Sequence, residues 1–187
     1  MRVETAIRTR HSIRRYSSMS LPLEKVIEIV DAARFAPTAG NIQTVRLIIV
    51  SDKDKIRQIA QSAVQDFIAV APYVIVVCSD NTQVKRFYEE RGIRYSRHQA
   101  GAAIQNMLLK VTELGLASCW VGAFDDNSIK RILVIPDSFE VEAILPIAKK
   151  PIVFREGRRK KMNLKDILSF DRYGDKTYRP IKKAEAR

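Results

Sequence analysis

The order of apolar and polar positions along the chain predicts helices and strands that follow one another in turn. Apolar residues recur at helical spacing over 22–35 and 52–64, so each segment is predicted to form a helix with one buried face. Ser20 is the expected cap of the first helix. Between the two helices, residues 45–50 form a short, mostly apolar run that is typical of a strand. Residues 73–78 form a second run, rich in β-branched side chains, and predict a strand that is buried on both faces.

The second half of the chain is dominated by an apolar helix over 99–114, which we expect to end at Gly115. It carries so little polar surface that it is predicted to be a core helix or one half of a subunit interface. Alternating strands and helices favour a layered α/β or α+β domain. The other expected elements are a charged helix over 83–91, strands over 118–123 and 142–148, helices over 127–133 and 164–170, and a basic loop over 149–162.

Length and composition indicate one globular unit. A chain of 187 residues, 46% of them apolar, is long enough to bury a real core. We therefore predict a single domain over 1–187, with its core over about 3–175 and a basic tail over 176–187. No apolar run reaches the roughly 18 residues of a membrane span, and residues 1–5 lack the apolar stretch of a signal peptide. These features predict a cytoplasmic protein with no membrane partner.

The net charge of +12 is concentrated toward the end of the chain. Residues 149–187 carry 14 Lys and Arg against 5 Asp and Glu, whereas residues 1–148 carry 19 against 16. Such an excess indicates an anionic partner: a phosphorylated cofactor, a nucleic acid or another charged surface. The basic segment has few aromatic side chains for base stacking and no nucleic-acid-binding motif, which weighs against nucleic acid.

The residue types that carry most enzyme chemistry are scarce. The chain has two histidines and contains no glycine-rich nucleotide-binding motif, nucleophile elbow or zinc-ligand spacing. Cys78 and Cys119 lie in apolar runs, so we expect buried, reduced thiols, and the pair Asp125-Asp126 is expected to cap a helix. The sequence assigns no catalytic side chain and no metal site. Any reaction therefore depends on a cofactor that the protein binds and orients.

The stretch Arg10-His11-Ser12-Ile13-Arg14 is a candidate phosphate site. Arginine offers a forked set of charged donors and serine a compact neutral one, and both suit a phosphate group. A solvated basic stretch is the alternative when these residues are considered alone.

Five blocks of the sequence resemble the nitroreductase family, in the family's order and spacing. They are Arg10-x-Ser12-x-Arg14-x-Tyr16, Ala32–Gln43, Ala71–Cys78, Ala103–Leu109 and Gly115–Phe124. The resemblance implies an α+β fold, a three-layer sandwich with a central, mostly antiparallel sheet flanked by helices. It also implies a homodimer with FMN bound at the interface. The implied reaction is ping-pong: NAD(P)H reduces the flavin and leaves, and an electron-poor small-molecule acceptor such as a nitroaromatic, a quinone or a flavin is then reduced.

By this resemblance, Arg10, Ser12 and Arg14 hold the FMN phosphate, and His11 contributes ring or backbone contacts. The family completes the phosphate site from a basic segment near the end of the chain. Here that segment is 157–162, and Arg159 and Lys161 are the residues we expect to contribute. They are one residue apart, so they share one side of an extended strand.

The segment 37–41 resembles the family's flavin loop, which reaches the flavin across the dimer interface. Gly122-Ala123 resembles the segment whose backbone N–H groups face N5 and O4 of the flavin. Gln65 matches a family glutamine that contacts the flavin, with an exposed helix amide as the alternative. In the loop, the resemblance assigns the cofactor contacts to Pro37, Thr38, Ala39 and Asn41.

The chain departs from the family pattern in three places. Gln43-Thr44-Val45 stands where Gln-Pro-Trp is common, so aromatic packing is lost there, and His98-Gln99 stands where an acidic residue often precedes the core helix. The segment from Cys78 to Tyr95 is short and predicts a small substrate lid. Its charged and aromatic residues are expected to bind an anionic substrate or the pyrophosphate of NAD(P)H, or else to form an ordinary solvated surface: Arg86, Phe87, Tyr88, Arg91 and Arg94.

Two other functions stay open from the sequence. A flavin-binding relative could carry out a different redox reaction in the same fold. A basic nucleic-acid-binding protein is the alternative from another class, and it rests on the charge of residues 149–187 alone.

Overall fold

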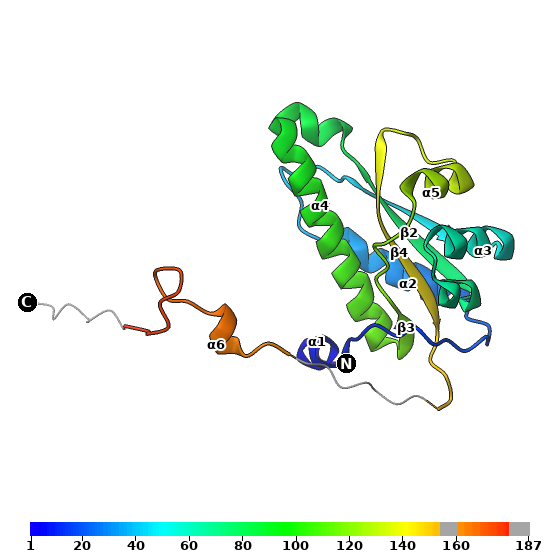
Figure 1. Cartoon of the computed structure of the whole chain (residues 1–187), viewed down its shortest axis with the longest axis horizontal. Helices are drawn as coiled ribbons and strands as arrows, with labels where there is room; N and C mark the ends of the chain where they lie inside the picture. The colour runs from blue at the N-terminus through cyan, green and yellow to red at the C-terminus, as the bar shows by residue number, and fades with distance from the viewer. Residues whose placement is uncertain (154–160, 180–187) are drawn as a thin grey trace, which may run out of the picture. The chain divides into compact units, whose positions relative to one another are not determined.

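The computed structural model describes residues 1–153 and 161–179, and its centre is a four-stranded sheet (Figure 1). The strand order is β1-β2-β4-β3, and each neighbouring pair is antiparallel. β1 and β3 therefore form the two edges of this sheet. The strands are β1 (Val45–Val50), β2 (Tyr73–Asp80), β3 (Leu116–Ser118) and β4 (Phe139–Lys149).

Helices cover both faces of the sheet. On one side lie α2 (Leu23–Asp31), which continues into the 3-10 turn η1 (Ala32–Phe35), and the long helix α4 (Thr82–Glu113). On the other side lie α3 (Lys53–Ser62), the turn η2 and α5 (Asp126–Leu133) (Figure 1). The predicted three-layer α+β sandwich is confirmed. The remaining elements are α1 (Val3–Thr9), η2 (Asp66–Val70) and α6 (Leu164–Ile167).

Strand β2 explains why the protein has two cores. Alternate side chains of a strand point to opposite faces, and here both sets are apolar. Ile75 and Val77 pack in the core beneath α2 and α4, whereas Val74 and Val76 pack beneath α3 and α5. All four side chains are fully buried, which confirms the prediction of a strand covered on both faces.

Helix boundaries follow local chemistry. The Asp52 side chain accepts hydrogen bonds from the backbone N–H groups of Asp54 and Lys55 at the start of α3, and Asp125 caps α5 through the N–H of Ser128. The expected capping role of Asp125 is confirmed. Ser20 does not cap α2, because the helix begins at Leu23, directly after Pro22, and no side chain caps it.

Two predicted elements differ in the structure. Residues 83–91 and 99–114 were expected to form separate helices, but both belong to α4, which has one break at Glu89 (φ 49°, ψ −135°). At this break the chain folds back so closely that a Cβ on Gly92 would lie 2.5 Å from the carbonyl oxygen of Val84. The predicted strand over 118–123 is shorter and begins earlier, as β3, and is followed only by an isolated bridge from Val121 to Ile144.

Residues 155–187 separate from 1–154 as a second compact unit. In its described part, the short helix α6 is followed by a turn in which Phe170 N–H donates to the carbonyl of Asp175. The Phe170 ring packs against that of Tyr178, with their centroids 5.4 Å apart. Residues 154–160 and 180–187 lie outside the described parts.

Glu142 should make the stability of the protein depend on pH. It lies at a bulge of β4, where the register against β2 shifts between Val77 and Cys78, and burial raises the pKa of its carboxyl group above the usual 4.5. The folded state thus holds the proton more tightly than the unfolded chain does. The stabilisation it provides at low pH is lost as pH rises through the folded pKa.

We expect Glu142→Gln to remove this dependence. The free energy of unfolding of the variant, relative to that of the native protein, should rise between about pH 4 and pH 7. Urea unfolding at several pH values measures it. A constant difference across this range would contradict the assignment.

Candidate functional site

The backbone of Arg10–Arg14 is tied to the end of the sheet. Ile13 is buried, and its N–H donates to the carbonyl oxygen of Ser118, at the end of β3, at 2.9 Å. A second link follows at Ser17, whose N–H donates to the carbonyl oxygen of Lys149 at 3.0 Å. Because alternate residues of extended backbone point to opposite sides, the burial of Ile13 leaves Ser12 and Arg14 exposed.

The first half of this stretch lines a small hollow of only about 10 Å³. Arg10 and His11 line it together with Ser118 and Lys150, and Nδ1 of His11 lies 2.7 Å from the carbonyl oxygen of Thr9. The cavity thus joins cationic side chains from the two ends of the first compact unit. Lys150 was not among the residues assigned from the sequence. The signal was present in the pair Lys149-Lys150, in which Lys149 ends β4 and Lys150 directly follows it.

The segment that follows β3 has exposed backbone. Val121 exchanges backbone hydrogen bonds with Ile144 at 3.0 Å, after which Gly122 and Ala123 are exposed. A Cβ built on Gly122 meets no atom within 4 Å. A flat ring could therefore approach the backbone there. The bond from Ile13 to Ser118 brings this segment and the cationic stretch to the same region of the protein.

The loop 37–41 lies away from the Arg10–Arg14 stretch. Gly40 and Asn41 both have left-handed backbone, with φ of 58° and 57°. A Cβ on Gly40 would lie 2.5 Å from the hydroxyl oxygen of Tyr88, so a larger residue there would displace this side chain of α4. Pro37 and Asn41 are exposed, and Thr38 and Ala39 are partly buried.

These two groups lie at opposite ends of α4. The cavity with Arg10 is lined by Leu108, Val111 and Thr112 near the C-terminal end of the helix, whereas Gly40 faces Tyr88 near its N-terminal end. From Gly92 to Leu108 a helix rises about 24 Å, at 1.5 Å per residue. Figure 1 shows α1 and β3 beside the C-terminal end of α4. One protomer therefore does not bring the loop and the cationic stretch together.

The remaining predicted residues are placed as follows. Gln65 lies in the turn between α3 and η2, partly buried, and its N–H donates to the carbonyl of Ala60 at 3.0 Å. Lys161 is exposed in the second unit. Arg159 lies outside the described residues.

Buried titratable groups near the site keep their protons. Burial raises the pKa of the Tyr16 hydroxyl, whose ring packs edge-on against Phe67 with centroids 5.9 Å apart. Burial likewise raises the pKa of the Cys78 thiol to about 11. Cys78 and Cys119 are both free and buried, as predicted.

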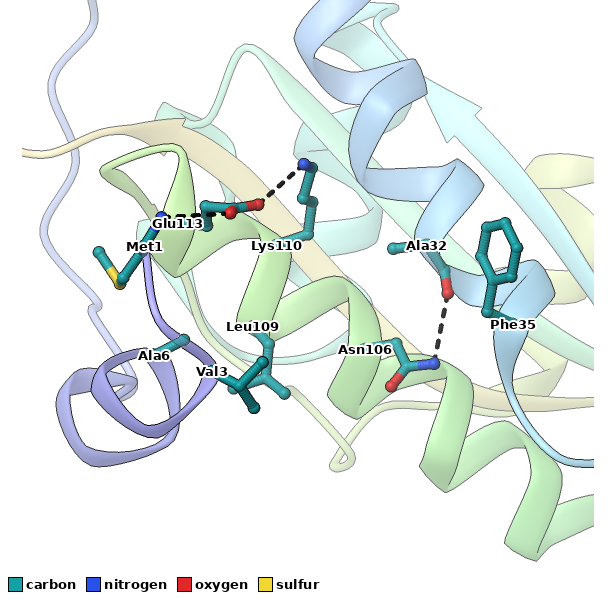
Figure 2. Close-up of a pocket in the computed structure, with 9 residues that line it drawn as sticks. All are labelled: Met1, Val3, Ala6, Ala32, Phe35, Asn106, Leu109, Lys110 and Glu113. Carbon is teal, nitrogen blue, oxygen red and sulfur yellow. Dashed lines mark hydrogen bonds and ion pairs between the residues drawn. The ribbon is translucent and has the colours of Figure 1, made fainter.

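A pocket of about 290 Å³ opens where α1, η1 and α4 meet (Figure 2). Apolar side chains such as Val3, Phe35 and Leu109 form much of its lining. At its polar edge, the Asn106 amide donates to the carbonyl oxygen of Ala32 at 3.3 Å, and Lys110 lies 2.8 Å from a Glu113 carboxylate oxygen. It contains none of the residues assigned from the sequence.

Comparison with known proteins identifies the family. The sequence model of the nitroreductase family matches residues 7–70 and 63–149. This protein belongs to the nitroreductase family. The match includes the cationic stretch, the loop 37–41 and Gly122-Ala123.

Relatives are found in archaea and bacteria. A Methanocaldococcus jannaschii protein assigned as a nitroreductase is 29% identical over 171 residues, which cover 73% of this chain and 86% of the relative. A protein of Archaeoglobus fulgidus assigned as an NADH dehydrogenase/NAD(P)H nitroreductase is 30% identical over 146 residues, covering 75% of this chain and 81% of the relative.

Solved structures show the nitroreductase fold. B. megaterium NfrA2 superimposes with a TM-score of 0.83 at 20% identity, over 91% of this chain and 74% of that one. A nitroreductase family protein from Clostridium novyi NT gives 0.75 at 23% identity, over 94% and 96%. At these identities the likeness establishes the fold alone.

Two kinds of feature are absent from the described residues. Over 1–153 and 161–179, no helix is both long and apolar enough to cross a membrane. Within those same ranges, His, Cys, Asp and Glu side chains form no group of three suited to a metal ion.

Proposed function

We propose that this protein is an FMN-dependent oxidoreductase that uses NAD(P)H to reduce an electron-poor small molecule by a ping-pong reaction. The observation that supports the proposal is the hydrogen bond from Ile13 to Ser118, which ties the cationic stretch to the segment that reaches the exposed backbone of Gly122 four residues later. Names of relatives support it. FMN reductase (NADPH) of Bacillus subtilis is 27% identical over 150 residues, and NADPH-flavin oxidoreductase of Vibrio harveyi is 24% identical over 191.

The residues present fit a flavin phosphate. A phosphate monoester carries a charge of about −1.5 to −2 near neutral pH, so several cations are needed around it. Arg10 and Lys150 line one cavity, and Arg14 follows on the exposed side of the same stretch. Ser12 adds a neutral donor, and His11 lines the cavity beside Arg10. We propose that Arg159 and Lys161 add to this charge from the C-terminal segment.

The residues also fit a flavin ring. The ring needs a flat surface and N–H donors at its polar edge, and the exposed backbone of Gly122 and Ala123 offers both. Donors in that position favour the negative charge of the reduced ring. We assign ring or ribityl contacts to Pro37, Thr38, Ala39 and Asn41, and to Gln65 from the turn after α3.

We propose a homodimer because these groups are far apart within one chain. The five-carbon ribityl chain of FMN is far shorter than the rise of α4 between the hollow beside Arg10 and Gly40, so we propose that a second copy supplies the loop. The surface offers a suitable face. Exposed apolar side chains gather on α1, α2 and η1, and such patches mark association surfaces: Val3, Ile7, Leu23, Ile27 and Phe35.

FMN, when bound, would supply the two-electron redox chemistry between NAD(P)H and the acceptor. The chain's own part is to bind and orient: Arg10, Ser12 and Arg14 fix one end of the cofactor, and the backbone at Gly122 fixes the other. Placement of the reactants provides most of the rate in such a transfer. Burial raises the pKa values of Tyr16 and Cys78, which makes both groups weaker acids than they are in water. Water is the proposed proton source.

The test uses the purified full chain, loaded with FMN and freed of excess cofactor by gel filtration. We expect the protein to retain the visible band of oxidised flavin, and NADH or NADPH to bleach it under anaerobic conditions. Nitroaromatics, quinones and free flavins, added afterwards, should restore the band and give parallel-line steady-state kinetics. A protein that retains no flavin would contradict the proposal.

A second reaction is favoured by one comparison. Iodotyrosine deiodinase of Thermotoga neapolitana is 25% identical over 164 residues, covering 74% of this chain and 83% of that protein. The same panel should therefore include an iodinated tyrosine. Release of iodide that exceeds turnover of every nitroaromatic, quinone and flavin would assign this protein to reductive dehalogenation instead.

A further inference from the structure

Gln99 is a buried polar side chain that the proposed chemistry does not use. It lies in α4 and is only 4% exposed, yet its amide makes three hydrogen bonds to a segment far away in the sequence. Oε1 accepts from the Thr44 hydroxyl at 2.8 Å and from the Thr44 backbone N–H at 3.3 Å. Nε2 donates to Oε1 of Gln43 at 2.9 Å. The two acceptor bonds from Thr44 fix which end of the amide is oxygen.

These bonds hold the downstream end of the loop 37–41. Thr44, 1% exposed, is the last residue before β1, and its carbonyl oxygen accepts from the N–H of Asp80 at 2.8 Å. Thr44 is thus fixed on one side to the sheet and on the other to α4. Gln99 is the side chain that connects the loop's exit to the helix.

The loop turns through two consecutive left-handed residues. Gly40 adopts this region freely and Asn41 tolerates it, so the backbone preference of these two residues allows the turn but does not by itself fix the loop. Within the loop, Ile42 N–H donates to the carbonyl of Ala39 at 3.0 Å. Gly40 rests against Tyr88, just before the break in α4. α4 therefore contacts the loop region at two points, Tyr88 and Gln99.

We propose that Gln99 is a positioning residue that holds the loop 37–41 in the shape that receives the flavin. This inference rests on the proposed function. It gives a role to the departure Gln43-Thr44-Val45 from the family pattern. A proline at position 44 would have a fixed φ and no N–H. Thr44 instead has a backbone N–H and a hydroxyl, and both are satisfied by Gln99.

The inference predicts a loss of flavin affinity when the amide is removed. Gln99→Met keeps the length of the side chain but leaves the buried N–H and hydroxyl of Thr44 without this acceptor, an arrangement that a buried polar group tolerates poorly. We expect the loop to sample other conformations and the Kd for FMN to rise about tenfold. Gln105→Met, the same change at an exposed position of α4, should leave the Kd unchanged.

Thr44 supplies an independent pair of variants. Thr44→Val removes the hydroxyl at nearly constant shape and should weaken FMN binding, whereas Thr44→Ser keeps the hydroxyl and should bind FMN as the native protein does. A purely structural role would lower the melting temperature of the apoprotein in proportion to any change in affinity. A positioning role predicts faster amide hydrogen exchange confined to residues 37–44, with exchange in β2 and β4 unchanged.

The outcomes separate this inference from the proposed function. If the native protein binds no FMN, the proposed function fails. If the native protein binds FMN, and Gln99→Met and Thr44→Val bind it equally well with unchanged exchange over 37–44, the role of Gln99 is overturned. Faster exchange throughout the sheet would also overturn it, because that result shows general destabilisation. The role of Gln99 is supported if Gln99→Met and Thr44→Val raise the Kd for FMN and speed exchange over 37–44 alone, while Thr44→Ser binds FMN as the native protein does.

Discussion

Arg10→Ala should weaken FMN binding by about 10- to 100-fold, because hydrogen bonds to a charged group contribute about 1.5–3 kcal/mol each. Arg10 lines the cavity formed with His11, Ser118 and Lys150, so its loss removes charge from the centre of the proposed phosphate site. The side chain is partly exposed and lies outside the apolar core, so the fold should survive. Titration of the apoprotein with FMN, followed by quenching of flavin fluorescence, measures the change.

Riboflavin provides the matched ligand control, since it has the same ring and ribityl chain but no phosphate. Arg10→Ala should leave the Kd for riboflavin nearly unchanged. Arg57→Ala, on the exposed surface of α3, should leave the Kd for FMN unchanged. Equal losses for FMN and riboflavin would show that Arg10 does not act on the phosphate.

Gly122→Val should abolish detectable FMN binding without unfolding the protein. A Cβ at this position meets no protein atom within 4 Å, and the backbone has no left-handed φ, so valine is tolerated by the chain itself. The added methyl groups would instead occupy the space over the backbone where we place the ring. Because the short valine side chain cannot swing away from the ring, the loss of FMN affinity should exceed that of Arg10→Ala.

Gly122→Ala gives the graded comparison and should show an intermediate Kd. Ser138→Val places the same side chain on another exposed turn and should have no effect on binding. All three apoproteins should melt within a few degrees of the native one. Native affinity in Gly122→Val would place the ring elsewhere and contradict the assignment of this segment.

Much of the fold could be predicted from the sequence because its strands have strong local signals. The strand over 45–50 has the predicted bounds, and the β-branched run from Tyr73 forms the buried centre of the sheet. The strand after Gly115 was misplaced for a physical reason. The apolar residues Cys119 and Val121 are buried without forming a continuous ladder, and Trp120 between them is 41% exposed. Residues there are therefore buried without being paired in a strand.

The length of α4 was missed because the buried positions of its middle are not apolar. Gly92, Ser96 and Gln99 are buried there, so this stretch lacks the apolar spacing by which a helix is recognised. The contacts of Gln99 could not be predicted at all, because its partner Thr44 lies 55 residues away. Lys150 was within reach of sequence reasoning, and only the fold shows that it joins Arg10.

The central proposal is that each flavin site is built from two protomers. In this proposal the Arg10 stretch and Gly122 come from one protomer, and the loop at Gly40 comes from its partner. Gly40→Val is a suitable loop variant, since φ is +58° and a Cβ would lie 2.5 Å from the Tyr88 hydroxyl. Homodimers of Arg10→Ala, of Gly122→Val and of Gly40→Val should each bind FMN poorly.

The most direct measurement is FMN stoichiometry in heterodimers that are purified with two different tags. A dimer of one Arg10→Ala chain and one Gly40→Val chain has both defects in one site, and its other site is intact. We predict that it binds one FMN per dimer with native affinity. A dimer of one Arg10→Ala chain and one Gly122→Val chain has one defect in each site and should bind none tightly. Equally weak binding by both heterodimers would contradict a site shared between protomers.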